Sequence, residues 1–293
     1  MIQPVALQRR RLRLPGPDAQ YLGATLYRID DDRLRPLLLL NHGSPSDPAR
    51  MREMLEPNQV AAGWFARLGW AVLAPLRRGF GTSDGPCIER PPTQRPATAE
   101  DYLMSARNSA KDVLAAARSM AEHDRNIDAS QILAVGTSAG GLAAIALAEE
   151  APERLSGIVS FAGGRGARAD GTISGGIDAL AEAFRVLGRR ASVPQLWLYA
   201  ANDQAFPPPL AQRLVHEYST DAPVHPRLAI LPPIQGKGHA LIGNPLVWGP
   251  AVLDFLRELP ALAQPLELRG LVGYPSVTCY PSFDRPGGRL PEP

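Results

Sequence analysis

The chain has 293 residues, of which 45% are hydrophobic and 20% charged, so it can bury a sizeable core, and one large α/β domain is favoured over two. Its formal net charge of +2 gives no general reason to expect a nucleic-acid or membrane-surface partner, and no run approaches the roughly 18 apolar residues of a membrane span. The N-terminus lacks the apolar core of a signal peptide, so we predict a cytoplasmic protein, or a periplasmic or secreted one if an export signal has been removed.

Short apolar runs alternate with longer helical patterns along the chain, which is typical of a mostly parallel sheet covered by helices. Strands are expected at 7–14, 21–29, 36–41, 70–75, 131–136, 157–162, 195–201 and 227–231. Helices are expected at 58–68, 102–123, 139–150, 176–188, 208–219 and 246–258. The pattern predicts an α/β fold whose N-terminal portion is antiparallel.

The first predicted strand carries a basic cluster at residues 9–13, in which four of the five residues are arginine. Charged side chains are typical of a strand at the edge of a sheet, where they discourage pairing with another chain. We therefore interpret the cluster as an edge strand rather than as a nucleic-acid-binding patch.

Two later strands end in segments with possible chemistry. The run from Pro36 to Leu40 is apolar at consecutive positions, as expected for a strand buried on both faces, and Asn41-His42-Gly43-Ser44 follows it. After the strand at 70–75, Arg77 and Arg78 are expected either to bind a substrate carboxylate or to pair with acidic neighbours.

The hexapeptide Gly136-Thr137-Ser138-Ala139-Gly140-Gly141 lies between an apolar run that ends at Val135 and an alanine-rich run at 142–148. It is typical of a serine nucleophile on a strand-to-helix turn, where side chains two positions to either side of the serine would collide with the strand and the helix. Because such a string also arises by chance in glycine-rich chains, the flanking strand and helix carry the interpretation.

The His-Gly turn, the serine turn, an Asp after a late strand and a His near the end follow one another in an order that resembles the α/β-hydrolase superfamily. The resemblance covers about residues 20–260, and the combination is more specific than any single motif. Within the superfamily, residues 78–86 and 161–166 are similar to the dienelactone-hydrolase-like and prolyl-oligopeptidase-like branches. The resemblance implies an α/β-hydrolase fold with a mostly parallel eight-stranded sheet flanked by helices.

The resemblance also implies a division of the chain. Residues 1–260 are expected to form the hydrolase domain, and residues 261–293 a C-terminal extension or tail. The segment 163–190, where this fold often carries a lid, is short and has one helical pattern, so we predict a small or absent cap and an open site. Proline-rich residues 86–96 are predicted to form a loop.

The base that removes the serine proton is predicted to be His239, because imidazole accepts and returns a proton near neutral pH. The other histidines are His42, His123, His216 and His225. Only His239 combines a glycine-flanked loop with a position after the last predicted strand, and this fold has the chain order Ser, Asp, His. A loop histidine without a role is the alternative.

The carboxylate that orients the imidazole is predicted to be Asp203, which follows the strand at 195–201 and precedes Pro207. This matches the acid loop of the family that the chain resembles. Asp170 and Asp178 are the other candidates, in a glycine-rich loop and at a helix start. Alternatively, Asp203 only caps the helix that follows.

The oxyanion of an acyl-transfer intermediate needs hydrogen-bond donors, normally backbone N–H groups. We expect one from Ala139, which follows the nucleophile, and one from Ser44, because His42-Gly43-Ser44 resembles the family's His-Gly-X turn; a plain glycine turn is the alternative. Phe80 and Phe206 follow strand ends and are candidates for lining the substrate pocket.

These features predict a serine hydrolase that cleaves a small-molecule ester or related acyl bond, with no cofactor and no nucleic-acid partner. A serine peptidase acting on short peptides and a non-catalytic ligand-binding protein are the alternatives. Cys87 and Cys279 are more often unpaired thiols at such a separation, although they could pair, and neither lies in a metal-ligand spacing. The sequence leaves the substrate and the oligomeric state open.

Overall fold

Apolar runs of the sequence become the strands of one eight-stranded sheet in the computed structural model, which describes residues 6–45, 47–89, 95–168 and 170–259. The strands are β1 (Leu7–Pro15), β2 (Tyr21–Ile29), β3 (Arg35–Asn41), β4 (Ala71–Pro75), β5 (Ile127–Thr137), β6 (Leu155–Phe161), β7 (Gln195–Ala200) and β8 (Arg227–Leu231). Their order in the sheet is β1-β2-β4-β3-β5-β6-β7-β8. Only β2 pairs antiparallel with its neighbours, so the predicted fold class with its antiparallel N-terminal portion is confirmed.

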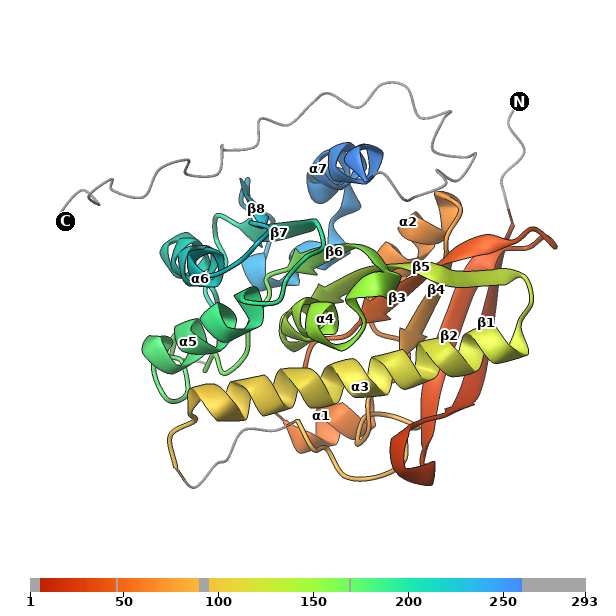
Figure 1. Ribbon diagram of the computed structural model, residues 1–293, viewed down its shortest axis with the longest axis horizontal. Coiled ribbons are helices and arrows are strands. Elements are labelled where there is room, and N and C mark those ends of the chain that lie inside the picture. Colours follow the sequence, from red (N-terminus) through yellow and green to blue (C-terminus); the bar gives the residue numbers. More distant parts are fainter. Residues whose placement is uncertain (1–5, 46, 90–94, 169, 260–293) are drawn as a thin grey trace.

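Helices cover both faces of this sheet (Figure 1). They are α1 (Pro48–Arg52), α2 (Gln59–Arg67), α3 (Ala99–His123), α4 (Ala139–Glu150), α5 (Ile177–Gly188), α6 (Pro208–Thr220) and α7 (Pro245–Glu258). Short 3-10 helices are η1 (Pro17–Ala19), η2 (Pro152–Arg154) and η3 (Gly238–Gly243). None of the helices in the described ranges is both long and apolar enough to cross a membrane.

The consecutive apolar residues of β3 supply both faces of the sheet. Leu37 and Leu39 pack in a cluster with α3, α4, α5 and α6, whereas Leu38 and Leu40 pack on the opposite face with α2 and α7. Successive side chains of a strand point to opposite faces, so a strand covered on both sides needs an apolar residue at every position.

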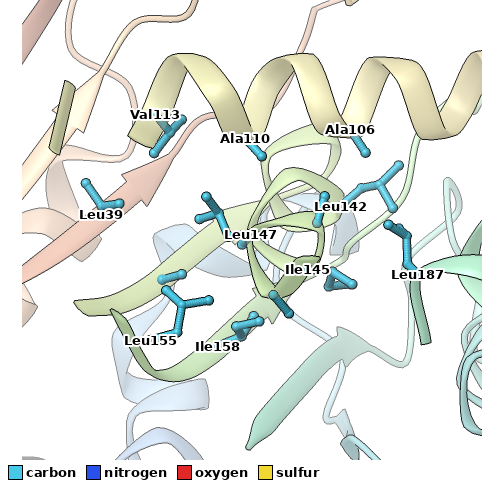
Figure 2. Close-up of a cluster of buried hydrophobic side chains, with 14 of the residues drawn as sticks. Leu39, Ala106, Ala110, Val113, Leu142, Ile145, Leu147, Leu155, Ile158 and Leu187 are labelled. Carbon is cyan, nitrogen blue, oxygen red and sulfur yellow. The ribbon is translucent and has the colours of Figure 1, made fainter. Parts of the chain in front are cut away.

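Helix α4 is the most deeply buried of these helices, and every residue from Ala139 to Ala148 is buried. Figure 2 shows Leu142 and Leu147 of α4 lying between Ala110 of α3 and Ile158 of β6. A helix that is apolar on all sides is stable only inside a core. The core therefore holds the N-terminus of α4, and with it residue 138, in a fixed position.

Two elements begin three or four residues earlier than the sequence predicts. Helix α3 begins at Ala99 rather than at 102, because Thr98 and Asp101 form a capping box in which each side chain accepts from the other's backbone N–H. Strand β5 begins at Ile127 rather than at 131, and a register shift along β3 accommodates its polar first residues. In both places the first residues of the element include polar ones, so the apolar pattern of the sequence begins later than the element itself.

The segment 163–190, predicted as a small cap, contains α5. The apolar face of α5, with Leu180, Phe184 and Leu187, is buried in the core cluster, so α5 is one of the helices that flank the sheet. The described residues of 163–176 are loop with one bridge between Ala167 and Ile173. The predicted tail at 261–293 lies outside the described residues.

Strand β1 lies at the edge of the sheet, as the basic cluster predicts. Its arginines form ion pairs with acidic residues of neighbouring loops: Arg9 and Arg11 with Glu56, and Arg13 with Asp84. The charges of the cluster are thus engaged within the chain.

Candidate active site

Ser138 occupies the turn between β5 and α4 in a conformation that residues with a side chain seldom adopt, with φ 55° and ψ −124°. Its N–H donates to Phe161 O at 2.9 Å, and its carbonyl accepts from the N–H groups of Gly141, Leu142 and Gly164 at 2.9, 3.1 and 3.1 Å. These bonds from both sides hold the serine in a strained backbone conformation.

The two glycines that flank Ser138 are required by close approach of the backbone. A Cβ at residue 136 would lie 2.1 Å from Gly140 O, and one at residue 140 would lie 2.3 Å from His42 O. Real Cβ atoms do not approach that closely, so the collision predicted from the sequence is present at both positions.

Asp203 and His239 come together across the loops that follow β7 and β8. His239 Nδ1 lies 3.1 Å from Asp203 Oδ2, and the Asp203 side chain is fully buried while that of His239 is 31% exposed. The other oxygen, Oδ1, accepts from the N–H groups of Ala205 and Phe206 at 2.8 and 3.1 Å. The Asp203 carboxylate is thereby fixed, with one oxygen directed at the imidazole.

Glycine at 238 lets the histidine loop approach the aspartate loop. A Cβ there would lie 2.4 Å from both the Asn202 carbonyl carbon and the Asp203 nitrogen. The Asn202 side chain joins the same loops, because Nδ2 donates to Ile234 O at 2.9 Å and Oδ1 accepts from Ile234 N–H at 3.1 Å. The glycine directly before His239 is therefore required by the close approach of the two backbones.

The turn that carries Ser138 is linked by packing to η3, which carries His239. Gly164, whose N–H bonds to Ser138 O, packs so closely on Phe206 that a Cβ at 164 would lie 2.4 Å from the ring. The Phe206 ring centroid is 5.5 Å from that of His239. Within the described residues no hydrogen bond joins Ser138 Oγ to His239, and catalytic hydrogen bonds often form only when substrate is bound.

The turn 42–44 lies against the serine. A Cβ at Gly43 would lie 3.4 Å from Ser138 Cβ. In the part of the chain that the structure describes, the N–H groups of Ser44 and Ala139 have no protein acceptor. Both N–H groups that the sequence predicts as oxyanion donors are therefore free to bind an anion.

Behind this turn lies a buried ion cluster, which we define as Arg77, Glu89 and Arg165. Arg77 Nε lies 3.1 Å from Glu89 Oε2, and Arg165 Nη2 lies 3.0 Å from the same oxygen. Burial raises the pKa of Glu89, but the attraction of the two guanidinium groups outweighs it and places this pKa at about 2. Glu89 is therefore ionised at neutral pH.

The two predicted arginines thus make structural pairs. Arg77 is paired with Glu89, and Arg78 with Asp112 at 2.7 Å and Asp18 at 2.6 Å. Arg77 is only 1% exposed, so a substrate carboxylate has no direct access to it.

Other candidates from the sequence lie apart or are enclosed. Phe206 lies beside His239, whereas Phe80 is fully buried and its ring is 4.6 Å from that of His42. Asp170 bonds within its own exposed loop, to Thr172, and Asp178 pairs with Arg213.

Among the remaining histidines, His42 is buried and His123 bonds to Ser119 O within α3. Of Cys87 and Cys279, the second lies outside the described ranges. Cys87 is half-buried and forms no disulfide with any described residue, and burial raises the pKa of its thiol.

Glu89 and Arg165 were not singled out from the sequence. Arg165 follows the glycines after β6, at the same edge of the sheet as Ser138, which is a usable signal for a site residue. Glu89 lies in a proline-rich stretch, where nothing marks it as buried. Across the described residues, no group of three or more His, Cys, Asp and Glu side chains is arranged to hold a metal ion.

Comparisons with solved structures show this fold in other proteins. A CIB-like hydrolase of Thermoplasma acidophilum is 18% identical with a TM-score of 0.56, covering 87% of this chain and 100% of that one. An esterase of Pyrococcus furiosus is 15% identical with a TM-score of 0.59, covering 86% and 91%. An acylaminoacyl peptidase of Pyrococcus horikoshii is 16% identical with a TM-score of 0.56, covering 83% of this chain but 39% of that one.

The sequence comparisons identify the family of the chain but no individual relative. No curated protein matches the chain. A family model described as the alpha/beta hydrolase family matches residues 37–282. Because this match spans most of the chain, the protein belongs to the alpha/beta hydrolase family.

Proposed function

We propose that the protein is a serine hydrolase that cleaves an ester or related acyl bond. The observation that carries the proposal is the strained conformation of Ser138, at φ 55°, on the turn between β5 and α4. The Asp203–His239 hydrogen bond at the same edge of the sheet supports it. Membership of the alpha/beta hydrolase family supports hydrolysis in general.

In this proposal, Ser138 Oγ attacks the acyl carbonyl carbon while His239 Nε2 takes the hydroxyl proton. Asp203 holds the imidazole by Nδ1 and stabilises its charged form. The N–H groups of Ser44 and Ala139 bind the oxyanion. His239 then gives its proton to the leaving alcohol, and a water molecule, deprotonated by His239, releases the acid from Ser138.

The test combines fluorophosphonate labelling with turnover of p-nitrophenyl esters of increasing acyl length. We expect the wild type to be labelled and to turn over, and Ser138→Ala to lose labelling and about a million-fold of kcat. Ser130→Ala, an exposed serine on the same strand, is the matched control and should behave as the wild type. Wild-type turnover by Ser138→Ala would refute the proposal.

The same assay separates the alternative functions. An aminoacyl-amide panel beside the esters tests the peptidase alternative. Part of the Pyrococcus horikoshii acylaminoacyl peptidase has a similar fold. Folded protein that neither labels nor turns over either panel would favour a ligand-binding role.

Within the family, we propose the dienelactone-hydrolase-like branch. The support is the sequence of residues 78–86 and 161–166 alone. In the structure, residues 78–86 lie in the segment after β4, which ends at Pro75, and residues 162–166 follow β6, so both segments come after strands that end at the same edge of the sheet as β5. Preference for short acyl groups or small lactones over long acyl chains would support this branch.

A further inference from the structure

The turn 42–44 is held by side chains for which the proposed mechanism has no use. Arg77 Nη1 donates to His42 O at 2.7 Å. The Arg77 backbone N–H donates to His42 Nε2 at 3.2 Å, and His42 Nδ1 lies 2.6 Å from Gly43 O. Two successive carbonyls of the turn are thus each bound by a side chain.

These bonds define the protonation state of His42. Because Nε2 accepts a hydrogen bond, it carries no proton, so the single proton is on Nδ1 and is donated to Gly43 O. Burial, and next the charge of Arg77, lower the pKa of His42 to about 3, which agrees with a neutral ring. With both nitrogens engaged and the residue 0% exposed, His42 is unavailable as a general base.

The bond to Gly43 O also sets the direction of the Ser44 N–H. The peptide between residues 43 and 44 is trans, and in a trans peptide the C=O and the N–H point in opposite directions. With Gly43 O turned toward the buried imidazole, the Ser44 N–H points away from it. Gly43 itself lies against Ser138, and the Ser44 N–H has no acceptor among the described residues.

His42 is in turn held from behind. Arg77 is fixed by Glu89 through both carboxylate oxygens, and Glu89 O accepts from Arg165 Nη1 at 3.0 Å and from Ser105 Oγ at 2.7 Å. The loops after β4 and β6 and helix α3 thereby hold the turn. Buried, mutually bonded charges of this kind define one geometry.

We propose that His42 is a positioning residue, whose Nδ1–H fixes the Gly43 carbonyl and so aims the Ser44 N–H at the oxyanion that forms on Ser138. The inference rests on the proposed serine hydrolase function. It assigns to His42 an effect on the charged intermediate and none on substrate binding.

A double-mutant cycle tests this role. His42→Phe keeps an aromatic ring but removes the donor, and Ser44→Pro removes the N–H of residue 44. We expect His42→Phe to lower kcat on a p-nitrophenyl ester about 100-fold with KM changed less than about 3-fold, since misplacing an oxyanion donor approaches the cost of losing it. In the Ser44→Pro background, His42→Phe should lower kcat less than about 3-fold, because the N–H that it positions is already absent.

Controls keep the outcomes distinct. His123→Phe removes another histidine that bonds to a backbone carbonyl, Ser119 O, far along the chain in α3, and should leave kcat unchanged. If His42→Phe does not fold, His42→Asn enters the same cycle: its amide can donate to Gly43 O, and kcat should stay within about 10-fold of the wild type.

A His42→Phe effect that is absent or equal in both backgrounds, or a 100-fold loss in folded His42→Asn, would overturn the inference. Loss of turnover in Ser138→Ala alongside would show that only the inference has failed, whereas wild-type turnover in Ser138→Ala would remove the proposed function itself.

Discussion

The two halves of the candidate site are built differently. The Asp203–His239 pair lies on loops after β7 and β8, and the His239 side chain is 31% exposed. The turn 42–44 is instead backed by the buried ion cluster, in which both arginines and Glu89 are 7% exposed or less. A group that carries protons must reach the substrate and reorient, whereas an N–H that only stabilises charge works best when it cannot move.

The largest effect is expected on the half of the site that contains Asp203 and His239. Asp203→Asn leaves a group that can still accept from Ala205 and Phe206, but its amide no longer stabilises a charged His239. We expect kcat to fall about 10,000-fold. Steady-state turnover of a p-nitrophenyl ester measures this, and Asp170→Asn, the exposed alternative, should retain wild-type kcat. Equal losses in both variants would contradict the assignment of the carboxylate.

On the buried half, the expected effect is on stability. Glu89→Gln leaves the Arg77 and Arg165 guanidinium groups buried without a counter-charge from residue 89. Breaking a buried ion pair by removing one partner costs about 3–5 kcal/mol of unfolding free energy. Urea unfolding measures the loss. Glu182→Gln, which breaks the partly exposed pair with Arg185, should produce a much smaller change. Similar losses of unfolding free energy in the two variants would show that the buried ion cluster stabilises the fold no more than a surface pair does.

The donor function of the turn is tested by comparing Ser44→Pro with Ser44→Ala. Both variants lose the hydroxyl, but only proline removes the N–H. The kcat of Ser44→Pro should be about 100- to 1,000-fold below that of Ser44→Ala, as when an oxyanion donor is removed. Circular dichroism and thermal melting confirm that both variants fold. A ratio near one would mean that another group binds the oxyanion.

The smallest effect is the pH dependence of stability. The pKa of His42 is lowered from its ordinary 6.5 to about 3, so the folded protein keeps this ring neutral where the unfolded chain binds a proton. The stability it contributes is therefore complete above pH 6.5 and is lost as the pH falls toward 3, by up to about 1.4 kcal/mol per pH unit. Glu89, lowered from 4.5 to about 2, adds its own loss only below pH 4.5.

Unfolding free energies from urea titrations between pH 7 and 4.5 isolate the histidine. In this window we expect the His42→Asn variant to lose stability less steeply than the wild type as the pH falls. Parallel slopes would show that His42 is not held neutral in the fold.

The sequence predicted the Asp203–His239 half of the site better than the buried ion cluster behind the turn 42–44. All eight strands were located, and the buried ones among them include runs such as 36–40 that are apolar at every position. Asp203 and His239 were expected to act together from their order in the chain, and the structure pairs their side chains. Glu89 and Arg165 were not predicted, because pairing between charges depends on how distant loops meet, and nothing in either local sequence records the partner.

The position of Ser138 has an evolutionary consequence. Its conformation is imposed by the backbone around it: by the core that buries α4 and by hydrogen bonds from β6 and the loop that follows it. The backbone thus sets the direction in which the side chain of residue 138 leaves the turn. In the proposed mechanism, the fold therefore fixes where the nucleophile lies, whereas the side chain at 138 supplies the chemistry, so a single substitution at 138 can end or redirect the reaction while the architecture persists.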